Sequence, residues 1–450
     1  MSSIGFYGAS GTVTGSNYVL TSSDNSRILV DLGMYQGTEE IVALNRKPLA
    51  YDPRQLTGAL LTHAHLDHCG RLPMLVKQGF RGKIFMTEPT LEMMQIVLLD
   101  AAHIAEIDEN VPQLYKDSDV LRLLDHVEVV DFDQTLRLGG FQITFRDAGH
   151  ILGAGSLEIH DPRSTHAQKI VFSGDLGNFP HSMLVSPHMF DSADVVVMES
   201  TYGGRNHPTD HALDILQAEI NAVEESGGVL MIPSFAIQRT QELLVMMRQL
   251  KDAGKIRMQT PVYLDSPMAI KVTEIYKHFG NLYNDSFHSV IGKSDPFRFP
   301  GLNILLRSKD NHIIETTLGP RVIIAGSGMM SGGRILKHAQ KYITHSKNRI
   351  LFVGYQGEET LGREISEGAH EVLIQDTQLQ VRAHITKMGS MSAHADESML
   401  LKWLSHMQGV KKVFLTHGEN TSREALAPKV RALGIQDVDM PELYDECALV

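Results

Sequence analysis

Four side chains that can bind a metal ion lie within six consecutive positions, directly after a short apolar segment. The segment "GALL" (58–61) is typical of a buried β-strand, and "THAHLDH" follows it with His63, His65, Asp67 and His68. In an extended loop, side chains two positions apart point to the same side. The pattern predicts a strand that ends at a metal site, with His63 and His65 on one ion and Asp67 and His68 on another. A histidine-rich surface loop is the weaker alternative.

Three further polar residues end apolar segments in the same manner. They are His150 in "DAGHILGAGS", Asp175 in "VFSGDLG" and His417 in "VFLTHGE". A single histidine at a strand end is usually a packing residue, but the number of such sites here favours ligands. We expect His150 to complete the first site and His417 the second, with Asp175 bridging the two ions. Nitrogen-rich sites without thiolates favour two Zn²⁺ ions, with Mn²⁺ or iron as chemical alternatives.

Two bridged ions about 3.5–4 Å apart favour hydrolysis, most naturally of a phosphodiester. Asp31, at the end of "ILVDLG", is interpreted as an acceptor that orients a ligand histidine, although a simple turn aspartate fits equally well. Glu199 in "MESTYGGR" and His394 in "SMSAHADE" are the remaining polar pair. A histidine held charged by a carboxylate could protonate the departing oxygen. The alternative is that Ser392 and His394 cap a helix that begins near Asp396, and spacing alone leaves both interpretations open.

The pattern of predicted strands and helices changes twice along the chain. Up to about Glu199, short β-rich segments alternate with turn clusters. From about Arg205, helices alternate with apolar strands in βαβ order, which predicts a mainly parallel sheet. From about Thr377 the pattern seen before Glu199 returns. We therefore expect an α/β protein in which residues 1–204 and 377–450 form one domain and residues 205–376 an inserted one.

Charge and cysteine content limit the function further. The formal net charge of −12 argues against a protein that coats nucleic acid nonspecifically, although local arginines could hold a phosphodiester in a cleft. The two cysteines cannot form a disulfide framework. No basic leader opens the chain, and no apolar run approaches the length of a membrane span, so we expect a cytoplasmic protein without a membrane partner.

Six motifs, in this order, resemble those of a known family: "THAHLDH", "GHILGAGS", "SGDLG", "ESTYG", "SAHAD" and "LTHGE". They are similar to the metallo-β-lactamase superfamily. Within it they resemble the β-CASP ribonucleases, which include the endonuclease subunit of the cleavage and polyadenylation specificity factor and its bacterial homologues. The resemblance extends over essentially the whole chain. It implies an αββα metallo-β-lactamase sandwich built from 1–204 and 377–450, with 205–376 as the inserted β-CASP domain.

The resemblance also implies roles for individual residues. In the family, the matches to His63, His65, His150 and Asp175 hold one zinc, and those to Asp67, His68, Asp175 and His417 hold the other. Asp67, Glu199 and His394 are the expected catalytic residues. RNA-directed members carry a histidine where this chain has His417, whereas a DNA-repair branch has an apolar residue there.

We therefore expect a zinc-dependent ribonuclease acting on single-stranded RNA. Alternatives are a hydrolase of a small thioester or lactam, a DNA-directed β-CASP nuclease, or an inactive RNA-binding scaffold. Whether the protein forms a homodimer is left open by the sequence. Weaker candidates for RNA or phosphate contacts are Arg239, Ser331, Gly332, Arg334, Lys387 and Ser392; for the glycine-rich segment 326–334 a flexible turn is an equal alternative.

Overall fold

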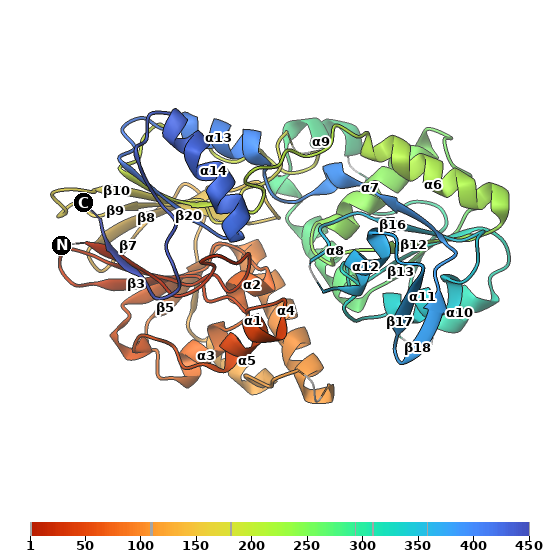
Figure 1. The fold of residues 1–450 in the computed structure, drawn as a ribbon, viewed down its shortest axis with the longest axis horizontal. Coiled ribbons are helices and arrows are strands. Elements are labelled where there is room, and N and C mark those ends of the chain that lie inside the picture. The colour runs from red at the N-terminus through yellow and green to blue at the C-terminus, as the bar shows by residue number, and fades with distance from the viewer. Residues whose placement is uncertain are drawn as a thin grey trace. The chain divides into compact units, whose positions relative to one another are not determined.

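The computed structural model describes residues 2–108, 111–180, 182–292, 294–307, 310–357 and 359–449. The chain divides into two compact units (Figure 1). The first unit comprises Met1–Asn206 and His394–Val450, and the second comprises His207–Ala393. The second unit extends past residue 376, the end expected from the sequence. The reason is that β19 (His384–Lys387) pairs in parallel with β16 (Arg349–Phe352) of that unit.

Within the described residues, the first unit contains two seven-stranded sheets. The first has the order β22-β1-β2-β3-β4-β5-β6, with strands β1 (Ser3–Phe6), β2 (Tyr18–Thr21), β3 (Arg27–Val30), β4 (Gly58–Leu60), β5 (Lys83–Met86), β6 (Val127–Val129) and β22 (Glu446–Ala448). The second has the order β21-β20-β11-β10-β9-β8-β7, with strands β7 (Thr135–Leu138), β8 (Phe141–Asp147), β9 (Gly155–His160), β10 (Lys169–Phe172), β11 (Val195–Glu199), β20 (Lys412–Thr416) and β21 (Asp437–Asp439).

Strand β11 shows how the layers form. Val195 and Val197 point into the apolar core between the two sheets, whereas Val196 and Met198 point to the opposite face. There they pack with Trp403 of α13 (Glu397–Ser405) and with α14 (Asn420–Ala432). Figure 1 shows α3, α4 and α5 on the face of the first sheet that points away from the second sheet. The first unit is thus an αββα sandwich, as predicted. Its remaining helices and 3₁₀ turns are α1 (Glu39–Ala43), η1 (Leu44–Arg46), η2 (Pro53–Gln55), α2 (Leu66–Cys69), α3 (Leu72–Lys77), α4 (Glu88–Ile107) and α5 (Asp117–Leu124).

The second unit is built on a sheet of order β14-β13-β15-β12-β16-β19, in which every neighbouring pair is parallel. Its strands read as continuous apolar runs because helices cover both faces, as in β12 "VLMIP" and β15 "RVIIA". The predicted mainly parallel α/β insertion is confirmed. The strands are β12 (Val229–Pro233), β13 (Val262–Asp265), β14 (Leu302–Ile304) and β15 (Arg321–Ala325), besides β16, β19 and the hairpin of β17 (Glu371–Ile374) and β18 (Thr377–Gln380).

Helices α11 and α12 pack on one face of this sheet, and Figure 1 shows α6 on the other. The helical elements are α6 (Ala212–Ser226), α7 (Arg239–Asp252), α8 (Pro267–His278), η3 (Gly280–Leu282), α9 (Asp285–Ile291), α10 (Asn311–Thr316), α11 (Ile335–Tyr342), α12 (Leu361–Ser366) and η5 (Gly389–Met391). Across the described parts of both units, none of the helices combines the length and apolar character needed to cross a membrane.

Candidate metal centre

The predicted site residues follow the ends of parallel strands in the first unit. Asp31 comes directly after β3, and His63 comes three residues after the end of β4, the parallel neighbour of β3. In the second sheet, β10, β11 and β20 are parallel neighbours, and they lead to Asp175, Glu199 and His417. Parallel strands end at the same edge of a sheet. The topology therefore gathers side chains that lie far apart in sequence at one edge of the sandwich.

The first group consists of His63, His65, His150 and Asp175, whose ligand atoms all lie within 4.8 Å of one another. His65 Nδ1 lies 3.1 Å from His63 Nε2 and 3.1 Å from His150 Nε2. Nitrogens bound to one tetrahedral zinc, at about 2.1 Å each, lie about 3.4 Å from one another. The three imidazoles thus converge with the spacing that a shared ion requires.

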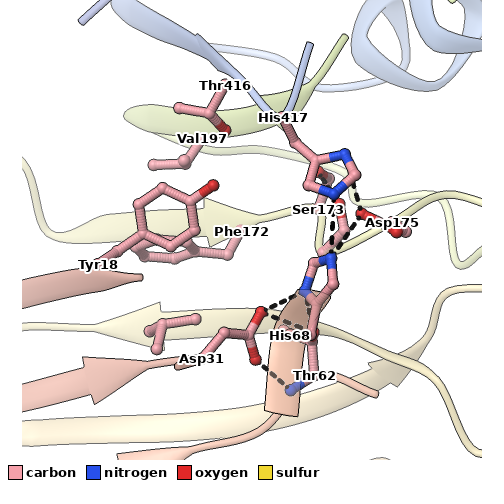
Figure 2. Close-up of a pocket in the computed structure, with 12 residues that line it drawn as sticks. Tyr18, Asp31, Thr62, His68, Phe172, Ser173, Asp175, Val197, Thr416 and His417 are labelled. Atoms are coloured by element: carbon pink, nitrogen blue, oxygen red, sulfur yellow. Dashed lines mark hydrogen bonds and ion pairs between the residues drawn. The ribbon is translucent and has the colours of Figure 1, made fainter. Parts of the chain in front are cut away.

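The second group consists of Asp67, His68 and His417. His417 Nε2 lies 3.2 Å from His68 Nε2 and 3.4 Å from Asp67 Oδ2. Figure 2 shows the rings of His68 and His417 facing one another across the space beside Asp175. His68 comes from the short helix α2 and His417 from the loop after β20, so the two ends of the chain build this group together.

Asp175 lies between the two groups. Its Oδ2 is 3.5 Å from both His63 Nε2 and His150 Nε2, and its Oδ1 is 3.3 Å from His68 Nε2 and 3.6 Å from His417 Nδ1. The side chain is 1% exposed, and neither oxygen has a hydrogen-bond partner among the described residues. A buried carboxylate without hydrogen bonds is costly unless a cation satisfies it. The arrangement therefore fits a bridging carboxylate between two cations.

Asp31 holds His68 from the opposite side. Its Oδ2 lies 2.8 Å from His68 Nδ1, while Oδ1 accepts a hydrogen bond from the Thr62 backbone amide at 2.8 Å (Figure 2). Contact at Nδ1 leaves Nε2 directed toward the second group, which is how an outer carboxylate orients a ligand histidine. Asp31 and His417 have φ of 57° and 48°, a conformation rare outside glycine. Such backbone strain is typical of functional sites.

Burial and charge set the protonation of these groups. Burial lowers the pKa of His63 well below its ordinary value and that of His65 to about 4, so both imidazoles are neutral near pH 7. Burial opposes charge on His68 as well, but Asp175 and Asp31 outweigh it and raise the pKa well above the usual range. Burial favours the neutral form of Asp175, yet the surrounding imidazoles hold its pKa well below normal. Cation binding would displace the His68 proton.

Glu199 and His394 form a contact beside the two groups. His394 Nδ1 lies 3.1 Å from Glu199 Oε2 and 3.9 Å from Asp175 Oδ2, and the His394 side chain is 21% exposed. Glu199 is buried and also accepts a hydrogen bond from the Leu176 amide at 2.6 Å. The helix-cap alternative is wrong: α13 is capped by Asp396, whose side chain accepts from the Met399 amide at 3.0 Å.

Sequence reasoning missed two threonines at the site. Thr62 Oγ1 donates to Asp31 Oδ2 at 2.8 Å and lies 3.1 Å from His63 Nδ1, so it links the carboxylate to a histidine of the first group. Thr201 Oγ1 lies 3.1 Å from His417 Nδ1. The position of Thr62 directly before "HAHLDH" was the available signal. Nothing local marks Thr201, because its partner is 216 residues away.

The weaker candidates for RNA contacts lie in the second unit, and they differ in how exposed their side chains are. Lys387 and Ser331 are exposed, and Gly332 and Ser392 are partly or largely buried. Arg334 is already paired, because its Nη1 lies 2.6 Å from the buried Asp265 carboxylate and also donates to the Leu305 carbonyl at 3.2 Å. Arg239 is 5% exposed. Their roles stay predictions.

A buried site of histidine and aspartate at the edge of an αββα sandwich defines a metal-dependent hydrolase. Comparison with known proteins agrees. Family models match residues 11–253 (metallo-beta-lactamase superfamily), 240–365 (Beta-Casp domain) and 378–441 (Zn-dependent metallo-hydrolase RNA specificity domain). The chain therefore belongs to the metallo-β-lactamase superfamily and to its β-CASP branch, which confirms the resemblance seen in the sequence.

Curated relatives cover nearly the whole chain. It is 37% identical to "Ribonuclease TTHA0252" of Thermus thermophilus over 96% of this chain and 97% of that protein. It is 30% identical to an "RNase J-like protein" of Methanocaldococcus jannaschii, over 90% of each chain. It is also 30% identical to "Transcription termination factor FttA" of Methanosarcina mazei, over 92% of this chain and 67% of the relative. A crystal structure of a protein of unknown function from Enterococcus faecalis V583 shares the fold, with TM-score 0.56, 11% identity and 99% coverage of both chains.

Proposed function

We propose that the protein is a zinc-dependent ribonuclease that hydrolyses phosphodiester bonds of single-stranded RNA. The observation that carries the proposal is Asp175, a buried carboxylate without hydrogen bonds that faces two imidazole groups at once. The names of the relatives and the RNA specificity domain matched at 378–441 favour RNA over a small thioester or lactam. The histidine at position 417 favours RNA over DNA.

Seven side chains would hold two zinc ions. One ion would lie among His63, His65, His150 and Asp175, and the other among Asp67, His68, Asp175 and His417. When bound, such ions lower the pKa of water and stabilise the charge that develops on phosphoryl oxygens. The neutral state of His63 and His65 and the ionised state of Asp175 are those that zinc requires of its ligands. Manganese remains the alternative ion.

The protein's own side chains would donate and accept the protons of the reaction. Water oxygen forms a bond to phosphorus, the bond from phosphorus to a ribose oxygen breaks, and that oxygen needs a proton. His394, held charged by Glu199, would donate it. Asp67, beside His417, would orient the attacking water and accept the proton that this water loses as its oxygen bonds to phosphorus. A cytoplasmic location is also proposed, because the substrate is RNA and both cysteines, Cys69 and Cys447, are free thiols.

The test uses linear RNA, circular RNA and DNA of one sequence, incubated with zinc-loaded protein and with the His394→Ala variant. Cleavage of RNA, with DNA spared and the variant at least about 100-fold slower at normal zinc content, is the expected result. Cleavage of linear RNA alone would mean an end-dependent enzyme. Inert RNA beside hydrolysis of a chromogenic lactam or a glutathione thioester would overturn the proposal in favour of a small-molecule hydrolase.

A further inference from the structure

The turn Gly389–Met391 lies three residues before His394 and is held by two side chains of the second unit. The first is Asp210. Its Oδ2 accepts a hydrogen bond from the Gly389 amide at 3.1 Å, and its Oδ1 accepts one from the Ser390 amide at 3.3 Å. Both oxygens of a single carboxylate therefore bind consecutive amides of the turn. This geometry fixes the orientation of the turn as well as its position.

Pro208 brings the chain close on the same side. A side chain at position 389 would place its Cβ 2.7 Å from Pro208 Cγ, nearer than atoms pack in proteins. Glycine at 389 is therefore what allows the turn to lie against the segment that carries Asp210. Residues 208–210 and 389–391 pack closely against each other, although they are far apart in sequence.

The second side chain is Arg239, the first residue of α7. Its Nη1 donates to the Met391 carbonyl and pairs with Glu242 one turn along the helix. Arg239 is 5% exposed, so its charge faces the protein and not the solvent from which RNA arrives. Its Nε and Nη2 are buried without a hydrogen-bond partner among the described residues. A guanidinium buried in this way costs stability, which favours a functional reason for its place.

The backbone before Arg239 points to the same conclusion. Gln238 has φ 69° and ψ −56°, a conformation that residues other than glycine rarely adopt. This conformation ends the loop after β12 and starts α7, and so directs Arg239 to the turn. Strained residues that persist at one position are typical of sites where geometry matters more than stability.

The chain on the other side of His394 is fixed within the first unit. The Ala395 amide donates to the Leu176 carbonyl at 2.8 Å, and His394 pairs with Gly177 in an isolated β-bridge. Leu176 and Gly177 directly follow Asp175. His394 therefore follows, by three residues, the turn that Asp210 and Arg239 hold in the second unit, and within the first unit it lies beside the residues that follow Asp175.

We propose that Asp210 and Arg239 are positioning residues for His394, acting on the peptide that carries the proton donor and not on RNA. This inference rests on the proposed function, in which His394 protonates the departing oxygen. It replaces the RNA contact predicted for Arg239. A displacement of about 1 Å at a reacting group can lower a rate by about 100-fold. We therefore expect even the conservative changes Arg239→Lys and Asp210→Asn to lower the rate of RNA cleavage.

The test compares two phosphodiesters at saturating zinc. RNA has a poor leaving group that needs a proton, whereas bis(p-nitrophenyl) phosphate releases a stable phenolate that does not. We expect Arg239→Lys and Asp210→Asn to lower kcat on RNA about 10- to 100-fold with KM within about 3-fold. Hydrolysis of the activated diester and zinc content should stay near wild type. Arg248→Lys, on the same helix but bonded to Asp252 and Ser294, is the matched control and should change neither rate.

A double variant decides between positioning and other roles. If Arg239 acts through His394, adding Arg239→Lys to His394→Ala should reduce the RNA rate no further. A raised KM with unchanged kcat in the single variants would mean an RNA contact and overturn the inference. Equal loss on both substrates, or additive loss in the double variant, would overturn it as well. The proposed function fails separately, if wild-type protein cleaves no RNA or if His394→Ala cleaves it at the normal rate.

Discussion

His394 Nδ1 lies 3.1 Å from Glu199 Oε2, and this contact keeps the imidazole protonated at neutral pH. Burial alone would lower the pKa of His394, but the charge of Glu199, with that of Asp175, outweighs it and raises the pKa to about 9. A histidine in water is mostly neutral at pH 7.5. The pair therefore converts an ordinary histidine into an acid that carries its proton over the physiological range.

This relationship predicts a pH dependence of RNA cleavage. The raised pKa means that His394 is charged below about pH 9 and loses its proton above, so kcat should fall on the alkaline side through about pH 9. Glu199→Gln removes the carboxylate charge, and the alkaline fall should move down toward the ordinary histidine pKa of about 6.5. Rates at saturating RNA between pH 5.5 and 10 measure both. An alkaline fall that the substitution leaves in place would assign it to another group.

Asp175→Asn should remove zinc more than any other single change. The amide keeps the size of the carboxylate but loses its charge, so neither group of imidazoles keeps its bridging anion. We expect zinc affinity to fall by more than about 100-fold, beyond the range seen for outer partners of ligands, and RNA cleavage to fall with it. Zinc bound after equilibrium against a chelator series measures the effect. An enzyme that retains two tightly bound ions after this change would remove Asp175 from the ligand set.

Much of the candidate site could be predicted from the sequence because four of its residues follow the ends of apolar strands. A strand reads locally as an apolar run, so His63, His150, Asp175 and His417 could each be placed at the end of a strand, and their number favoured one shared site. The βαβ pattern predicted the parallel insertion in the same local way, whereas the αββα sandwich was implied by the resemblance of the six motifs. What local rules cannot give is the side-chain partner across a long sequence distance.

Three features illustrate that limit. Spacing left His394 equally suited to cap α13, and only the fold shows Asp396 in that role and Glu199 beside the imidazole. Thr201 contacts a histidine 216 residues away. The second unit takes in β19 because an edge strand joins β16, and that pairing depends on register and not on composition.

Asp31→Asn tests the outer carboxylate behind His68. The amide can still accept from the Thr62 amide, but it no longer holds the His68 ring as a charged acceptor at Nδ1. Zinc affinity should fall about 10- to 100-fold while the fold is kept. Asp161→Asn is the matched control, because Asp161 is equally buried but binds Ser2 and Ser23 away from the metal centre. It should lower the melting temperature without changing zinc affinity. Equal zinc affinities in the two variants would mean that Asp31 is only a turn aspartate and does not orient His68 for zinc.

Gly33→Ala tests how closely the loop after β3 must approach the loop that carries Asp67. A Cβ at position 33 would lie 1.5 Å from the Asp67 carbonyl oxygen, so one of the two backbones must move. That movement would shift Asp67 and His68 from the second group. We expect about 1–3 kcal/mol loss of unfolding free energy, together with loss of one zinc per chain.

Gly280→Ala provides the control for this change, since its Cβ would come no nearer than 3.5 Å to other atoms and its stability should change by less than about 1 kcal/mol. Denaturant unfolding of the zinc-free proteins measures the backbone cost, and zinc counted per chain measures the displacement. A Gly33→Ala protein that is destabilised but still binds two ions would show that the loop yields away from the site. Loss of one ion without loss of stability would show that the second group tolerates almost no movement of Asp67.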